Sequence, residues 1–503
     1  QTSATKCLEL TKTLSHTNSE TYLLCLQMAG SIALLQGNYE EAKKYYEKTI
    51  QGNITPSSKT QAYVGHLALG VFHANQNNFK LAEEQMRTAT KKLDETFLSG
   101  LPIYAELTGN LAWVLLMQDK VEEAYLLAEK AAENYVNHLD RVFKYTSEKD
   151  KINFLRAADI DFYATVAMRK INEPRVRERL YLRILQYKNN ILDQLASQNE
   201  IRSISLDPTI KRIFQELTAK RKKLSGLKIS LAKKLIEPGN YLKLKKEIDE
   251  LERRFSLAYS ENSISPGLSG LNMDRLLESI PKNSTLIEFV KVNTDKFNEK
   301  SKEDKYIAIV VNSKKEINVV VLGKAKEIDG ALASLKRSVR EVDDELTIKT
   351  KANKLYKSIF KPLEKYFIFK PLEKYLSRSK SIFIAPDSNL NLLSFNILVD
   401  DAGKYLIEKY AISYVNSGKD FLKKFNKTNN TKKETFVFAG NPSFDPPENI
   451  MEIPIASSEL FLAQVRSADS DGLHFKPLPE TQVEVDEIGS LFKSDNNVVI
   501  LSG

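Results

Sequence analysis

The sequence predicts a helical N-terminal part followed by an α/β region with a mostly parallel sheet. Three observations support this fold class. A helical pattern repeats about every 40 residues near the N-terminus, which is typical of a helical solenoid. Apolar residues keep helical spacing to about residue 262, and short β-branched runs separated by helical stretches then take over. We expect repeats at residues 1–139, continuing helices and an antiparallel helical hairpin at 140–262, and the α/β region at 263–503.

The composition of the 503 residues favours a soluble protein with several cores, since 42% are hydrophobic and 28% are charged. The 74 basic and 65 acidic residues interleave, so the net charge of +9 is diffuse and weakly favours acidic partners. No apolar run approaches the roughly 20 residues that span a bilayer, so we expect no membrane partner. Two cysteines, Cys7 and Cys25, are too few for a disulfide scaffold.

The first residue is Gln rather than Met, which indicates a processed or trimmed chain. Removal of a signal peptide and a chosen chain boundary both explain this. The sequence therefore does not decide the cellular compartment: the cytoplasm is slightly favoured, and export after signal-peptide removal is the alternative.

Three N-terminal segments share a small residue in a first helix, a polar turn, and an alanine in a second helix. The small residues are Gly30, Gly70 and Ala112, and the alanines are Ala42, Ala82 and Ala124. Small residues at a helix crossing let the two helices approach closely. The pattern resembles tetratricopeptide repeats, in a form longer than their usual length of about 34 residues.

Stacked helix pairs of this kind leave a concave groove that binds a protein or peptide. The resemblance implies that six residues line it: Gln27, Ser31, Val71, Asn75, Trp113 and Met117. An alternative of equal weight is that Trp113 and Met117 fill the core. Cys25, on the apolar stretch LLCLQM, is interpreted as a packed thiol rather than a reactive one.

The middle of the chain is predicted to stay helical, with a boundary at Pro174 and a new helix at Asp207-Pro208. A turn at residues 237–240 would reverse the chain into a hairpin. The basic run at residues 220–223 suggests the hypothesis that this hairpin binds nucleic acid. No aromatic residues interleave with it, and acidic residues at 247–252 face it, so we interpret it as a solvated coiled-coil face and do not expect nucleic acid as a partner.

The helical period changes at residues 263–270, where Ser, Pro and Gly concentrate. Short apolar runs then predict strands at 284–292, 306–311, 317–322, 381–385, 435–439 and 498–501. Helices are expected at 324–342, at 346–376 with a break or kink at Pro362 and Pro371, and at 483–492. Continuous apolar strands separated by helices favour a mostly parallel sheet covered on both faces.

The stretch at residues 381–417 carries the most specific pattern. Its first strand ends in the turn Pro386-Asp387-Ser388, a helical turn contains Leu393-Ser394-Phe395, and residues 404–415 alternate like the arm of a strand hairpin. This closely resembles the CHAT domain, a caspase-like domain usually found with tetratricopeptide repeats. Ser388 replaces a usual Gly, and Ser394 a usual Pro. The GNP turn, the LPET step and the final VVILSG follow in the family's order, so the resemblance covers about residues 283–503.

The resemblance implies a bacterial cysteine endopeptidase, a hydrolase related to caspases and separase, with a His after one central strand and a Cys after the next. In that family both residues lie beyond the position that matches Gly503. No Cys follows Cys25, and His474 precedes the expected place of the dyad, so it is interpreted as a loop residue. We therefore name no catalytic residue in this chain.

Other chemistry is not indicated. The sequence has no metal-ligand spacing of His and Cys and no Gly-rich phosphate loop, so no metal and no cofactor are expected. Asp387 is interpreted as a cap of its own turn rather than a catalytic acid.

In the caspase-like strand order, the strand at 435–439 pairs with the one at 498–501, and the strand that carries the His covers its other side. A bare apolar edge is avoided in natural proteins, so we expect the chain to continue or a second fragment to supply the other half. The prediction is the N-terminal part of a prokaryotic CHAT protease, inactive as it stands, whose repeats bind a protein activator or substrate. The alternatives are a non-catalytic adaptor that scaffolds protein partners and, more weakly, a basic helical nucleic-acid binder.

Overall fold

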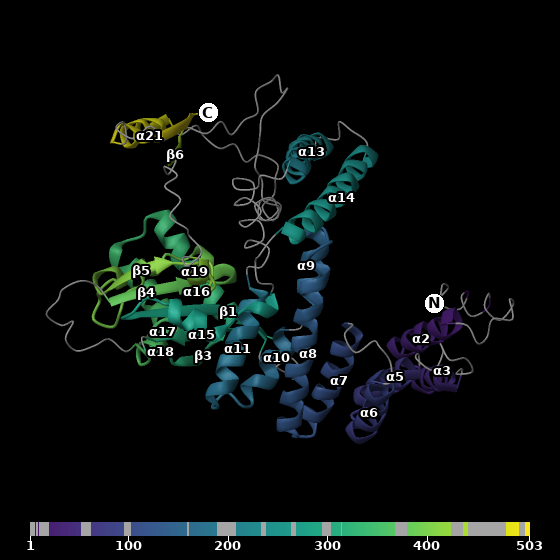
Figure 1. Cartoon of the computed structure of the whole chain (residues 1–503). Helices are drawn as coiled ribbons and strands as arrows, with labels where there is room; N and C mark the ends of the chain where they lie inside the picture. Colours follow the sequence, from purple (N-terminus) through teal and green to yellow (C-terminus); the bar gives the residue numbers. More distant parts are fainter. Residues whose placement is uncertain are drawn as a thin grey trace. The chain divides into compact units, whose positions relative to one another are not determined.

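The computed structural model describes most of the chain and is drawn in Figure 1. The described residues are 6, 9, 20–51, 62–94, 102–157, 160–188, 208–232, 238–262, 268–293, 303–312, 314–367, 380–423, 436–440, 479–491 and 498–502. Pro371, His474 and Gly503 lie outside them. The contacts divide the chain into two units, Gln1–Glu200 with Ser260–Lys424 and Ile201–Tyr259 with Phe425–Gly503.

The first unit begins with an array of helix pairs. Three pairs follow one another along the chain: α2 (Glu20–Leu35) with α3 (Tyr39–Gln51), α5 (Ala62–Asn75) with α6 (Phe79–Asp94), and α7 (Pro102–Met117) with α8 (Val121–Val142). The array continues through α9 (Glu148–Ala157), α10 (Ile160–Met168) and α11 (Pro174–Tyr187). The predicted helical pairs and the boundary at Pro174 are confirmed.

Each pair is joined by the same turn. Gly37, Asn77 and Asp119 have positive φ values of 77°, 58° and 58°. In each turn this residue and the next donate backbone hydrogen bonds to carbonyls three and five residues earlier, as for Gly37 to Leu34 and Asn38 to Ala33. This pair of hydrogen bonds is the Schellman motif, which ends a helix with one left-handed residue.

The small residues of the repeat lie where the two helices of a pair cross. A Cβ atom at Gly70 would lie 2.6 Å from Cγ of Met86, and one at Gly30 would collide with the ring of Tyr46. In the third pair Ala112 is fully buried, and Ala128 is buried in the same core. The predicted reason for the small residues, close approach of the helices, is confirmed.

The central sheet has five strands among the described residues: β1 (Ser284–Val292), β2 (Lys305–Val311), β3 (Ile317–Lys324), β4 (Lys380–Ala385) and β5 (Tyr410–Tyr414). Their order is β3-β2-β1-β4-β5. The first three strands form an antiparallel meander, and β4 and β5 are added in parallel. The sheet is thus mixed, and with the parallel pair β6–β7 three of the five described pairings are parallel, as the fold class predicted.

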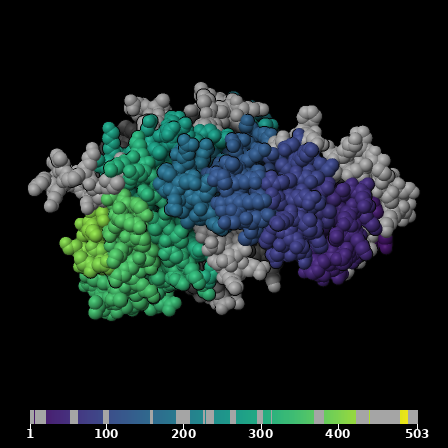
Figure 2. Space-filling view, turned by 90° about the horizontal axis from the view of Figure 1, so that it is seen from below, coloured from purple at the N-terminus to yellow at the C-terminus, as the bar shows by residue number. Residues whose placement is uncertain are grey.

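Both faces of this sheet are covered. Leu286, Val290 and Ile309 face a core that also contains residues of α7, α8, α10 and α11, so the array and the sheet share one hydrophobic core. Ile287 and Phe289 face the opposite core, which is closed by α16 (Ala325–Glu341), α17 (Glu345–Ile359) and α18 (Lys361–Glu364). Figure 2 shows the blue surface of the array adjoining the green surface of the sheet region.

Two local expectations were wrong. Residues 404–415 do not form a hairpin arm: Leu406–Glu408 is a short 3-10 turn, and β5 pairs in parallel with β4. A single antiparallel bridge between Val399 and Tyr405 is the only hairpin-like pairing described there. Of the expected turn at residues 237–240, residue 237 lies outside the described residues, and Pro238, Gly239 and Asn240 form the first turn of α14.

The second unit contains two separate elements. Helices α13 (Pro208–Ala232) and α14 (Pro238–Asn262) share a small core of their own, centred on Leu217, Ile248 and Phe255. Strands β6 (Phe436–Gly440) and β7 (Val498–Ser502) pair in parallel, with α21 (Pro479–Leu491) packed on them. The predicted pairing of these two strands is confirmed.

Among the described helices, none combines the length and the apolar character that a membrane span requires.

Candidate functional site

The carboxyl end of β4 is held by Asp387. One carboxylate oxygen accepts a hydrogen bond from the backbone N–H of Ser388 at 2.9 Å, and the other accepts one from the backbone N–H of Lys291 at 2.8 Å. Both oxygens therefore bind backbone donors, which fixes the exit of β4 beside the end of β1. The interpretation of Asp387 as a turn cap is confirmed.

The face of the sheet that packs against the helical array carries a carboxylate, Glu288 of β1, which is fully buried. Its Oε1 lies 2.6 Å from Nζ of Lys188, at the end of α11. Its Oε2 accepts hydrogen bonds from the backbone N–H of Gly418 at 2.8 Å and from the hydroxyl of Tyr181 at 3.3 Å. We call Tyr181, Lys188, Glu288 and Gly418 the Glu288 joint.

Lys188 binds two strands at once. Its ammonium also donates to the carbonyls of Phe289 at 2.9 Å and Ala385 at 3.2 Å. Its own carbonyl accepts a hydrogen bond from Nζ of Lys419 at 2.7 Å. Polar contacts therefore tie the end of α11 to β1, to β4 and to the turn after β5, in addition to the apolar core that they share.

The Glu288 joint is buried and closely packed. Burial, and after it the charge of Glu288, raises the pKa of Tyr181 well above its ordinary value. The phenol therefore stays protonated and donates a hydrogen bond to Glu288. A Cβ atom at Gly418 would collide with the Tyr181 hydroxyl and would lie 3.2 Å from a methyl carbon of Leu286. Only glycine lets the backbone N–H reach Glu288 here.

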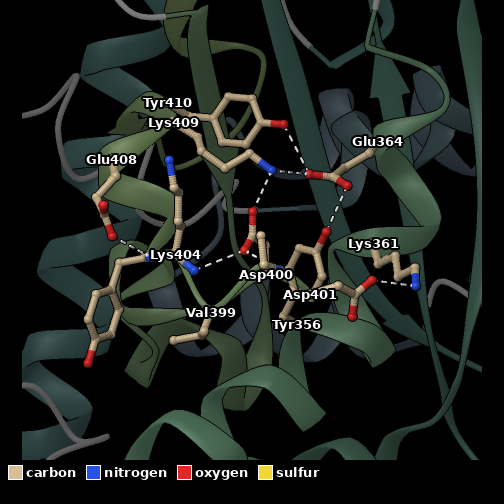
Figure 3. A network of polar contacts seen from close by, with 12 residues as sticks. Tyr356, Lys361, Glu364, Val399, Asp400, Asp401, Lys404, Glu408, Lys409 and Tyr410 are labelled. Atoms are coloured by element: carbon tan, nitrogen blue, oxygen red, sulfur yellow. Dashed lines mark hydrogen bonds and ion pairs between the residues drawn. The ribbon is translucent and has the colours of Figure 1, made fainter.

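A second polar network, drawn in Figure 3, lies at the amino end of β5. Glu364 of α18 accepts hydrogen bonds from the hydroxyls of Tyr356 at 2.7 Å and Tyr410 at 3.0 Å. Nζ of Lys409 lies 3.4 Å from Glu364 and 3.0 Å from Asp400. This network joins α17 and α18 to the turn that precedes β5. It lies at the amino ends of β4 and β5, whereas Asp387 lies at the carboxyl end of β4.

Asp400 organises that turn. Its Oδ1 accepts backbone hydrogen bonds from Ala402 at 2.9 Å and Lys404 at 3.0 Å. Burial alone would raise the pKa of Asp400, but these bonds and the ammonium of Lys409 outweigh it and lower the pKa. For Lys409 burial lowers the pKa, and the hydrogen bond to Asp400 with the charge of Glu364 outweighs it, so the pKa is raised. Glu364, Asp400 and Lys409 are each paired with an opposite charge, which is typical of a structural network.

The six predicted groove residues lie on the first helix of each pair. Ser31, Asn75 and Met117 are exposed, while Gln27, Val71 and Trp113 are partly buried. Val71 and Trp113 pack against the main core. Met117 is 41% exposed, so core filling describes Trp113 better than Met117. Binding at these positions remains a prediction.

The interpretation of Cys25 as a packed thiol was wrong. Cys25 is buried, as expected, but it is disulfide-bonded, and no free cysteine is present among the described residues. In the described part of the chain, His, Cys, Asp and Glu residues form no group of three or more that could hold a metal ion. The basic run at 220–223 is faced by acidic residues as predicted: Lys220 lies 2.7 Å from Glu247, and Arg221 lies 2.8 Å from Glu252.

The Glu288 joint was missed in the sequence. A single acidic residue inside an otherwise apolar strand, Thr-Leu-Ile-Glu-Phe-Val, was a usable signal, because a charge in that position needs a buried partner. The partner, Lys188, is 100 residues away along the chain, and local periodicity gives no information about it.

Comparison with known families finds a match in the C-terminal part of the chain. Residues 349–503 match the CHAT domain. This CHAT region begins within α17 and includes β4 and β5, whereas β1 to β3 precede it. A search of curated proteins found no match.

Proposed function

We propose that this chain is the N-terminal part of a CHAT-family cysteine protease, inactive as it stands, whose helical repeats bind a protein activator or substrate. The observation that carries the proposal is the CHAT match at residues 349–503, with a helical array that precedes the sheet and shares its core. An array packed in this way is suited to present a bound protein to the α/β region.

The contacts between array and sheet support this arrangement. Asp161 of α10 accepts a hydrogen bond from the backbone N–H of Asn293, just after β1, at 3.0 Å. Arg177 of α11 donates to the carbonyl of Ile317 in β3 at 2.7 Å. With the Glu288 joint, these bonds hold the last helices of the array against three strands of the sheet.

The groove is tested by site-specific photocrosslinking. A photoreactive phenylalanine analogue is placed at Asn75 or Met117, and at Leu126, a residue 59% exposed on the second helix of its pair, as the matched control. We expect one protein to be crosslinked in an extract of the source cells from the two groove positions and not from the control. Equal labelling at all three positions would contradict groove binding.

The protease assignment is tested separately on the uncut reading frame. If it supplies a His-Gly and a later Cys, we expect the longer protein to cleave a protein substrate and its Cys→Ala variant to bind without cleaving. A reading frame that supplies no further Cys after residue 503 defines the adaptor instead. The weaker nucleic-acid alternative ends if the chain shows no affinity for generic duplex DNA at low salt.

A further inference from the structure

The first helices of the three pairs, α2, α5 and α7, carry almost no charge. Together they contain no Lys and no Arg, although the chain has 74 of these residues, and their acidic residues are Glu20 and Glu106. The second helices differ, since α3 alone contains three Glu and three Lys among its 13 residues. A partner that contacts the first helices therefore meets a different chemistry from one that contacts the second helices.

One side of each first helix is left open by the packing of the array. The residue seven positions before the left-handed turn residue, such as Gly70, meets the second helix of its own pair. The residue twelve positions before it, such as Gly65, meets the preceding pair, since a Cβ atom there would lie 2.6 Å from Cγ1 of Ile50. Positions 13, 9, 6 and 2 before the turn residue share another side of the helix, because they are three or four residues apart. All twelve residues at these positions in the three helices are exposed or partly buried.

We call these twelve residues the first-helix face. Eight of them are apolar, three are polar without charge, and Glu106 alone is charged. Leu24, Met28, Leu35 and Met117 are between 41% and 88% exposed, so much of this apolar surface is open to water. Apolar surface of this kind marks a site of protein contact, and the flexible Met side chain adapts to varied apolar partners. Five of the six predicted groove residues belong to this face.

Glu106 distinguishes one end of the first-helix face from the other. Its side chain is exposed, and no Lys or Arg among the described residues forms an ion pair with it. Its charge reaches the neighbouring first helix: burial, and after it the charge of Glu106, raises the pKa of Tyr63 on α5. A carboxylate near an aromatic ring suits a Lys or Arg side chain, which interacts with the carboxylate by charge and with the ring through its π face.

We propose that the first-helix face binds an apolar segment of the partner protein, with a Lys or Arg at the end that lies over Glu106. The proposal rests on the proposed function, since it names the chemistry of what the repeats bind. The face has no cation that could pair with a carboxylate, so an acidic segment would lose its hydration there without compensation. Ser31, Asn75 and Asn110 are the polar residues of the face, and their side chains are suited to bind the backbone of the segment.

The chemistry of the segment is tested by peptide selection. A phage-displayed library of random peptides is selected on the full chain and, in parallel, on Glu106→Lys and on the double variant Leu24→Asp, Met28→Asp. We expect the wild type to recover apolar peptides in which Lys or Arg is enriched about threefold, the effect of one exposed ion pair. Glu106→Lys should recover apolar peptides enriched in Asp or Glu instead, and the double variant should recover few of either.

Three results would overturn the proposal. These are acidic peptides from the wild type, an unchanged preference for Lys and Arg with Glu106→Lys, and a library from which the wild type recovers nothing or only what the double variant also recovers. The substituted residues are exposed, so the variants should unfold at the temperature of the wild type, which circular dichroism checks. If the double variant unfolds earlier, Leu35→Asp, at a residue 88% exposed, takes its place.

Trp113, the single tryptophan of the chain, shows where a recovered peptide binds. It lies on α7 seven residues after Glu106, which is about 10 Å along the helix. A synthetic copy of a recovered peptide, free of Trp, should therefore change the emission of Trp113 at the same concentration that raises the anisotropy of the labelled peptide. Anisotropy that rises without any change in emission would place the peptide elsewhere and contradict the proposal.

The result is separable from the test of the proposed function. If Asn75 and Met117 crosslink one protein through an acidic segment, the repeats bind a partner and the apolar segment is wrong. If the expected peptides are recovered but no protein is crosslinked, the chemistry of the face stands and the proposed function falls.

Discussion

Gly418 shows how one residue without a side chain permits a buried ionic contact. Its backbone N–H donates to Glu288, and the space where a Cβ would lie is filled by Tyr181 and Leu286. The glycine is thus required by the close approach of another side chain rather than by its own backbone conformation.

We expect Gly418→Ala to lower the free energy of unfolding by about 1–3 kcal/mol, because the added methyl group overpacks a full site. Tyr181→Phe removes the hydroxyl that the methyl would strike and by itself loses a hydrogen bond of about 1 kcal/mol. The double variant should therefore lose less than the sum of the two single losses. Urea unfolding of the four proteins measures this; strict additivity would mean that the hydroxyl is not the obstacle.

The ion pair between Lys188 and Glu288 gives a second prediction at this scale. Lys188→Met leaves the carboxylate buried without its cation, so we expect a loss of about 3–5 kcal/mol. Lys188→Met combined with Glu288→Leu should lose less than Lys188→Met alone, since no charge is then buried. Lys43→Ala, which breaks an exposed pair at 3.9 Å, is the matched control and should change stability little. A loss at Lys188 no greater than at Lys43 would contradict the role given to the joint.

Asp400 predicts a dependence of stability on pH. Its pKa is lowered in the folded protein, so the stabilisation is present above its ordinary pKa of about 4 and is lost as the pH falls through the folded value. We expect Asp400→Asn to be less stable than the wild type by about 1–2 kcal/mol at pH 7, and the gap to close on acidification. Chemical unfolding between pH 7 and pH 3 measures it. Asp401→Asn, at an exposed carboxylate, should change stability much less; a gap at Asp400 that is constant with pH would be against the prediction.

At the scale of the element, the repeated turn is the feature that defines the array. Three different residues, Gly37, Asn77 and Asp119, take the same left-handed conformation in the same Schellman motif. Gly, Asn and Asp are the residue types that adopt this conformation at least cost. The turn chemistry, and not only the apolar spacing, therefore sets the length of each first helix.

Asn77 allows this to be measured. A β-branched residue strongly disfavours positive φ, so Asn77→Ile should lower the free energy of unfolding by about 1–2 kcal/mol, whereas Asn77→Gly should change it by less than about 0.5 kcal/mol. Thermal unfolding followed by circular dichroism compares the two. Similar losses from both substitutions would indicate that the Asn side chain, rather than its backbone conformation, is what the turn needs.

The sequence predicted the elements whose signals are local. The helix pairs follow from the repeated Gly30, Gly70 and Ala112, and the Asp387 turn follows from the chemistry of a Pro-Asp step. The disulfide at Cys25 and the parallel pairing of β5 were not predicted. Alternation along residues 404–415 looks the same for a hairpin arm and for an edge strand added in parallel, and buried apolar surroundings look the same for a thiol and for a disulfide.

At the scale of the whole molecule, the distribution of cores predicts which parts unfold together. Helix α11 shares a core with the sheet, whereas α13 and α14 have a core of their own. Leu180→Ala on α11 should therefore lower the free energy of the main unfolding transition by about 2–5 kcal/mol. Phe255→Ala on α14 should leave that transition in place.

Hydrogen exchange locates the two effects. For Phe255→Ala we expect lost protection within residues 208–262, and for Leu180→Ala lost protection in α10, α11 and the strands β1 to β3. Loss of protection in the sheet after Phe255→Ala would show that the hairpin is not an independent core.

The pairing of β4 with β1 has a practical consequence for anyone who recombines this protein with a relative. The family match starts at residue 349, but Ile384 and Ala385 in β4 are hydrogen-bonded neighbours of Ile287 and Glu288 in β1, more than 60 residues before that border. A chimera spliced at the border would replace a strand's partner while keeping the strand. A splice placed ahead of α10 would transfer β1 and β4 together, with the helices α10 and α11 that pack on them. It would also keep Lys188, whose ammonium neutralises the buried carboxylate of Glu288, in the same segment as that carboxylate.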